Sequence, residues 1–213
     1  MTRLLASSFL LLLLSGIALA GGPDANRVAA AKDLARRAGA QVRWDEETGT
    51  PARVRFSQSE ERPGTAPEVA AALLQETLAP LYEDTLRVEL NAEFQPAGSV
   101  LVLKQARDLG QGRVRVIFEQ RVSGMLVDCG GLSVELAQGE QGWRPIRVEG
   151  RYYPGLEAKL VTEFNPALEA AILESFPSYQ DGEISSAPTV NRLIHVHNGQ
   201  ARASYCVDSI SIE

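Results

Sequence analysis

The spacing of apolar residues in the first third of the chain predicts two amphipathic helices. The first begins after the capping residue Asp24 and stops at Gly39, with apolar or small residues at three- and four-residue intervals: Val28, Ala31, Leu34, Ala35 and Ala38. The second begins after Thr65, a good N-cap, and carries an apolar stripe as far as Tyr82. Pro80 predicts a bend or a stop near its end.

Elsewhere the period changes to two, which predicts strands. Residues 42–44 and 53–56 alternate around a turn-rich segment and predict a hairpin, and an antiparallel meander is expected from strands at 86–94, 100–105, 113–122, 132–137 and 143–149. A third helix is predicted from Asn165-Pro166 to Phe176, followed by strands at 183–186, 191–197 and 200–212 with a hairpin signal at Asn198-Gly199.

This order predicts an α+β fold with two small modules of antiparallel sheet packed with helices. The expected divisions are an N-terminal helix and hairpin at 21–64, a first module at 65–156 and a second module at 157–213.

Residues 1–20 have the pattern of a secretory signal peptide. Arg3 precedes an apolar run from Leu4 to Leu14, and Ala18-Leu19-Ala20 provides a small-residue cleavage site. The run is shorter than the ~20 residues of a membrane helix. We therefore expect cleavage after Ala20, a secreted or periplasmic product, and no membrane association after the signal is removed.

The charge balance is acidic, with 21 basic and 27 acidic residues and a formal net charge of −6 that becomes −7 when Arg3 is removed. Along the sequence the basic residues are scattered among the acidic ones and form no stripe. Nucleic-acid binding needs a basic footprint, so nucleic acid is not expected as a partner.

Two cysteines, Cys129 and Cys206, would enter an oxidising compartment. They could form a disulfide that links the two modules, or remain unpaired as small apolar residues. Neither is a persuasive nucleophile, because the only histidines, His195 and His197, lie far along the chain.

The sequence contains no H-E-x-x-H zinc motif, no G-x-S-x-G elbow and no phosphate-binding glycine loop. His195 and His197 would share one face of a strand and could form a metal pair, but no third ligand is evident, and such residues are more often at the surface. We expect no catalytic residues, no metal and no cofactor.

Residues 116–136 hold a distinctive pattern, in which an aromatic residue and a glutamine precede a glycine-bordered turn and an apolar strand. It resembles the FTP (fungalysin/thermolysin propeptide) module, whose motif is matched at Phe118, Gln120, Gly124, Val127 and Gly130. Leu126, Asp128 and Cys129 depart from the family pattern. Two flanking segments support the match: residues 42–51, which end in Thr-Gly-Thr-Pro, and residues 148–156. The region beyond Asn165 resembles a PepSY domain, the second part of the same propeptides.

The resemblance implies a propeptide-type inhibitor and intramolecular chaperone of a secreted thermolysin-like metallopeptidase, without the catalytic domain. The implied partner is that catalytic domain, in cis or in trans, and the chain itself is not expected to be an enzyme. Two alternatives remain: a stand-alone secreted or periplasmic inhibitor acting in trans, and a secreted binding domain with no protease partner. Chains of this family normally continue past the position of Glu213 to a catalytic domain.

Overall fold

A computed structural model describes residues 22–83, 86–91, 98–156, 167, 190–197 and 200–207. The signal peptide with Ala20, all but one residue of the helix expected from Asn165, the strand expected at 183–186 and the Asn198-Gly199 turn lie outside these residues.

Both N-terminal helices form as predicted. Helix α1 spans Ala25–Ala38; Asp24 accepts a hydrogen bond from the Arg27 backbone N–H at 2.9 Å, and Gly39 ends the helix with φ 56°. The second helix runs through α2 (Ala66–Ala72), the π-helical η1 (Leu73–Leu78) and α3 (Ala79–Tyr82), with a capping box formed by Thr65 and Glu68.

The widened turns of η1 lie immediately before Pro80. Proline has no backbone N–H to donate to the preceding turn, so the regular α-helical ladder is interrupted at this point. None of the helices in the described ranges is long and apolar enough to cross a membrane.

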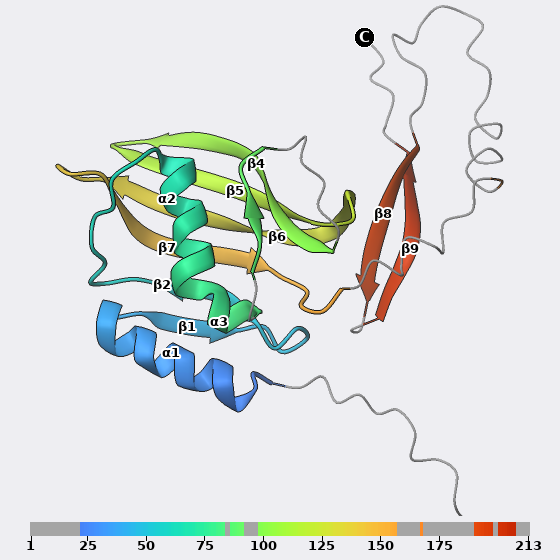
Figure 1. Ribbon diagram of the computed structural model, residues 1–213, viewed down its shortest axis with the longest axis horizontal. Helices are drawn as coiled ribbons and strands as arrows, with labels where there is room; N and C mark the ends of the chain where they lie inside the picture. The colour runs from blue at the N-terminus through green and yellow to red at the C-terminus, as the bar shows by residue number, and fades with distance from the viewer. Residues whose placement is uncertain are drawn as a thin grey trace, which may run out of the picture.

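The strands form one sheet in the order β1-β2-β7-β6-β5-β4-β3, and the β8–β9 hairpin is attached to it through β6 (Figure 1). Their bounds are β1 Gln41–Trp44, β2 Pro51–Arg55, β3 Val88–Glu89, β4 Ser99–Gly110, β5 Arg113–Val122, β6 Met125–Gln138, β7 Trp143–Arg151, β8 Val190–His197 and β9 Gln200–Val207.

The predicted fold class is wrong. The strands do not form two small antiparallel sheets packed with helices; they form a nine-stranded mixed sheet in which β3 is parallel to β4 and β8 is parallel to β6. The reason is the length of β6, which pairs with β5 on one side and has two partners on the other. Its second half pairs with β7, while Leu126 and Val127 pair with β8. The division into modules at residue 157 stays a prediction.

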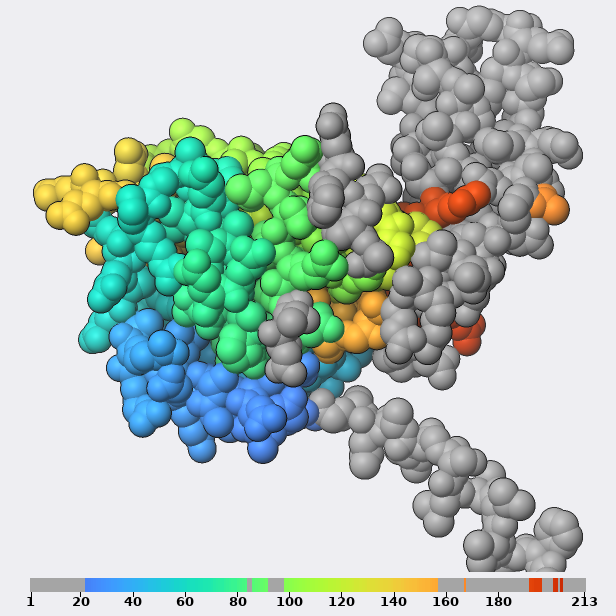
Figure 2. All heavy atoms as spheres, viewed as in Figure 1, coloured from blue at the N-terminus to red at the C-terminus, as the bar shows by residue number. Residues whose placement is uncertain are grey.

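The described helices cover one face of the sheet (Figure 1), and α1 and the second helix form much of the surface visible in Figure 2. Beneath them, Val54, Val148, Val134 and Val116 form a buried row across four neighbouring strands. A smaller buried cluster joins the β8–β9 hairpin to the sheet: Val122, Val127, Tyr153 and Ile194.

The opposite face is basic. Because side chains alternate along a strand, the residues next to the buried valines point away from the helices. Seven arginines of this face, together with Glu135 and Glu149, are called the arginine face below: Arg43, Arg53, Arg55, Arg107, Arg113, Arg115 and Arg147. The expectation that basic residues form no stripe is therefore wrong, since the sheet register gathers arginines that the sequence separates.

Candidate functional site

Gln120 fixes the point where the chain leaves the end of β7. Its side chain is fully buried, and its carboxamide binds both backbone groups of Tyr153: Nε2 donates to the carbonyl oxygen at 2.7 Å, and Oε1 accepts from the backbone N–H at 3.0 Å. Nε2 also donates to Ser99 Oγ at 3.0 Å. The glutamine carboxamide therefore pairs with the backbone N–H and carbonyl of Tyr153, as the backbone of a neighbouring strand would.

The residue before Tyr153 is held from two other directions. Thr50, also fully buried, donates its hydroxyl to the Tyr152 carbonyl oxygen at 3.0 Å. The Tyr152 hydroxyl contacts a Glu83 carboxylate oxygen, and the second oxygen of Glu83 accepts from the Gly155 N–H at 3.1 Å. Burial, and then the Glu83 hydrogen bond, raise the pKa of Tyr152. The phenol is therefore neutral and donates to this carboxylate.

We call this set the junction: Thr50, Glu83, Gln120, Tyr152 and Tyr153. Arg151, just before it, extends the same anchoring, because its Nε lies 2.9 Å from Asp45 Oδ2. Side chains from the turn after β1, from the end of the second helix and from β5 thus hold the chain where it leaves β7.

The two glycines of the predicted motif serve different purposes. Gly124 (φ 86°) follows Ser123 (φ 48°) in the two-residue turn from β5 to β6, where both residues need positive φ. Gly130 is needed for close approach, since a Cβ there would lie 2.9 Å from Val127 Cγ1 and 3.2 Å from Gln120 Oε1. The next residue, Gly131, has φ 156°, and a Cβ there would lie 2.3 Å from the Phe118 carbonyl oxygen.

The structure brings three of the five predicted motif residues together. Gln120, Val127 and Gly130 are in contact or near contact, and Val127 is buried beside Tyr153 in the smaller cluster. Phe118 is buried in the main core opposite Leu132. Gly124 lies at the turn that starts β6. Sequence reasoning missed Glu83, because a lone acidic residue after a helix gives no signal of its tyrosine partner.

A second set of polar residues lies beside the junction, at the start of β6. His195 Nδ1 lies 2.9 Å from Asp128 Oδ2, and Cys129 Sγ lies 3.5 Å from Asp128 Oδ1. The sequence placed the histidines far from Cys129, but the parallel pairing of β8 with β6 brings His195 close. The position of the His197 side chain lies outside what the structure describes.

This set does not activate the thiol. Asp128 is the shared neighbour of both His195 and Cys129, and its hydrogen bond and charge raise the pKa of the Cys129 thiol. The His195 hydrogen bond lowers the pKa of Asp128, so the carboxylate stays charged at neutral pH. A catalytic thiol requires the opposite shift.

Cys129 is exposed and carries a free thiol in this structure. Cys206 is opposite Asn191 in the β8–β9 pair, so β8 separates its strand from β6. Two strand spacings amount to about 10 Å, whereas bridged Cα atoms lie within about 7 Å. A Cys129–Cys206 disulfide stays a prediction, and it would require the hairpin to move relative to β6.

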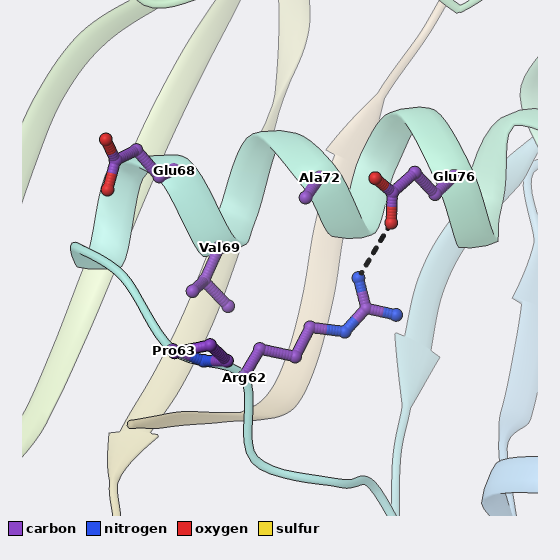
Figure 3. A pocket seen from close by; sticks show the side chains of 6 residues that line it. All are labelled: Arg62, Pro63, Glu68, Val69, Ala72 and Glu76. Atoms are coloured by element: carbon purple, nitrogen blue, oxygen red, sulfur yellow. Dashed lines mark hydrogen bonds and ion pairs between the residues drawn. The ribbon is translucent and has the colours of Figure 1, made fainter. Parts of the chain in front are cut away.

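The described residues hold no metal cluster, and a shallow groove beside α2 offers little chemistry. Within the described ranges, no three His, Cys, Asp or Glu residues are grouped so that they could hold a metal ion. A shallow groove lies between α2 and the segment before it, where Arg62 crosses toward Glu76 at 3.5 Å (Figure 3). Its other lining residues are Pro63, Glu68, Val69 and Ala72. This groove presents one ion pair and no nucleophile.

The three segments that carry the propeptide resemblance meet at the junction. Thr50 belongs to the Thr-Gly-Thr-Pro segment, Gln120 to the glycine-turn motif, and Tyr152 and Tyr153 to the segment after β7. No known protein-family model matches the chain, and no curated protein matches it. The resemblance therefore rests on these residues and on their contacts.

Proposed function

We propose that the chain is a propeptide-type inhibitor and folding assistant of an exported, thermolysin-like zinc metallopeptidase. It acts outside the cytoplasm after signal-peptide removal, and its partner is the catalytic domain of that enzyme, in cis or in trans. The chain itself contributes binding and no peptide hydrolysis.

The observation that carries the proposal is the meeting of the three resembling segments. They are separated by more than 100 residues from first to last, yet Thr50 and Gln120 bind adjacent residues of the third segment, Tyr152 and Tyr153. Short motifs shared by accident have no reason to form one hydrogen-bonded unit. A common folding role explains why these residue types occur together.

The junction also suggests how such a domain works. By holding Tyr152, Tyr153 and Gly155, it fixes the direction in which the chain leaves the main sheet. A domain that binds the native-like state of a partner stabilises that state by mass action. A rigid exit would present the following segment and the sheet to the enzyme in one orientation, which reduces the ordering cost of binding.

The test uses the chain purified without its signal peptide and a thermolysin-like metallopeptidase from the same source. We expect the chain to hydrolyse no peptide with or without added zinc, to slow hydrolysis by the enzyme in a concentration-dependent way, and to raise the yield of enzyme refolded from denaturant. If neither hydrolysis nor refolding yield changes at a tenfold excess of the chain, the proposal is wrong.

A matched pair of variants links the test to the junction. Gln120→Met removes the carboxamide that binds Tyr153, whereas Gln105→Met changes an exposed glutamine of β4. The first variant should inhibit less well than the unchanged chain, and the second should inhibit equally. Equal loss in both variants would argue that inhibition is unrelated to the junction.

A further inference from the structure

One row of side chains on the face of the sheet opposite α1 and the second helix has an unusual charge pattern. Arg55 of β2 lies opposite Arg147 of β7, which lies opposite Glu135 of β6. On the other side of Glu135, the row continues with Arg115 of β5 and Arg107 of β4. Like charges directly opposite each other destabilise a sheet, and two neighbouring pairs in this row are arginine pairs. Folding stability alone does not explain the row.

At the centre of the row, the carboxylate of Glu135 forms ion pairs with several arginines. Glu135 is only 2% exposed, and three arginines surround it: Arg113 contacts Oε1, Arg147 lies 2.7 Å from Oε2, and Arg115 lies 3.6 Å from Oε2. Arg147 also pairs with Glu149, which pairs with Arg53 as well. Two carboxylates thus hold four guanidinium groups in place and neutralise only two of them. The remaining positive charge is fixed in position at the surface.

Three other arginines of this face form no ion pair with any residue that the structure describes. Arg43, Arg55 and Arg107 are all exposed, and no carboxylate in the described ranges forms an ion pair with any of the three. The arginine face ends toward β8, where Glu119 pairs with both Lys104 and Arg121. The arginine face therefore carries seven positive and two negative charges, in a chain whose net charge is −6.

We propose that the arginine face is a docking surface for an acidic protein surface that presents a cluster of carboxylates. Guanidinium groups bind carboxylates through paired hydrogen bonds, and the groups here are already arranged on a rigid sheet. Charge complementarity of this kind raises association rates and orients the partner.

A protein fits this face better than a nucleic acid does. An extended polyanion would run past the arginine face onto the rest of the chain, which holds most of the 27 acidic residues. The strand residues described on this face include no aromatic side chain on which a base could stack. A compact acidic protein surface can contact the arginine face alone, without reaching the acidic residues around it.

The proposal rests on the proposed function only for the identity of the partner, which would be the metallopeptidase catalytic domain. Binding to carboxylates can be measured without that enzyme. We would titrate a fluorescein-labelled dodeca-glutamate peptide with the chain lacking its signal peptide, and follow fluorescence anisotropy at low and at physiological salt.

Two triple variants remove equal charge. Arg43→Gln/Arg55→Gln/Arg107→Gln removes the three arginines that form no ion pair with the described residues, so no described salt bridge is lost. The control Lys32→Gln/Arg36→Gln/Arg37→Gln removes three exposed charges from α1. We expect the first variant to weaken binding at least tenfold and the control to weaken it less than twofold. Physiological salt should also weaken binding of the unchanged chain.

Several results would overturn the proposal: no binding of the peptide at low salt, equal losses in the two triple variants, or at least tenfold tighter binding of a dT12 oligonucleotide or of phosphatidylglycerol vesicles. The enzyme assay separates this proposal from the proposed function. If the unchanged chain inhibits the metallopeptidase and the arginine variant inhibits equally well, the function stands and the docking surface is wrong. If the unchanged chain fails to inhibit but binds the peptide through these arginines, the function is wrong and the surface stands.

Discussion

Replacing Gln120 by methionine tests how strongly the junction stabilises the fold. Methionine has a similar length and fills the same buried space, so the substitution removes hydrogen bonds with little change in volume. Three are lost: the two to the Tyr153 backbone at 2.7 and 3.0 Å and the one to Ser99 Oγ at 3.0 Å.

The cost arises mainly at Tyr153, which is 5% exposed. Its backbone N–H and carbonyl oxygen would both lose their partner at a site closed to water, and each unsatisfied buried group costs about 1–3 kcal/mol. The Ser99 hydroxyl is only half-buried and can turn toward solvent. We therefore expect Gln120→Met to lower the free energy of unfolding by about 2–6 kcal/mol, a large part of the roughly 5–15 kcal/mol of a typical domain.

Urea denaturation followed by tryptophan fluorescence measures this change. With an m-value of about 2 kcal/mol/M, the midpoint should fall by about 1–3 M. The control Gln105→Met, on an exposed position of β4, should stay within about 0.5 kcal/mol. The Tyr153 amide should also exchange hydrogen faster in the Gln120 variant. A midpoint shift no larger than that of the control would refute the view that this carboxamide anchors the chain.

Three further predictions concern single sites. Gly130→Ala should destabilise the chain by about 1–3 kcal/mol, because the added Cβ meets Val127 at 2.9 Å, whereas Gly22→Ala, with nothing within 4 Å of the new Cβ, should leave the urea midpoint unchanged. Asp128→Asn should speed maleimide labelling of Cys129 severalfold at pH 7, since the carboxylate raises the thiol pKa; absence of labelling in both proteins without reductant would instead support the disulfide. The intact mass of the exported chain should correspond to cleavage after Ala20, and a secreted product that keeps the first 20 residues would contradict the signal-peptide assignment.

Local sequence signals predicted most of the helices and strands, and they did so where a residue type strongly favours one local backbone structure. Asp24 and Gly39 marked the ends of α1, and period-two alternation predicted β5 with its observed bounds, Arg113–Val122. These features depend on neighbours within a few residues. The beginning of β6 was placed seven residues too late, because Gly130 and Gly131 have the composition of a turn but form an irregular part of one long strand.

Strand partners could not be predicted in the same way. Nothing in residues 125–127 shows that they accept a parallel strand from 190–197 while the rest of β6 pairs with β7. That choice depends on which strand edges remain open after the sheet has formed. The contact between Asp128 and His195 follows from this pairing, and so it could not be predicted from the sequence either.

The arginine face shows why the overall charge of a chain is a poor guide to its partners. Along these strands, arginines alternate with apolar residues, as in Arg53-Val54-Arg55. Because successive side chains point to opposite faces, the apolar residues point into the core. The register then aligns arginines from four strands, with Glu135 at their centre. From a net charge of −6 alone, a basic partner would be expected. Because screening limits surface electrostatics to about 8–10 Å, a partner senses the face that it meets and not the whole chain, and this face selects for an acidic one.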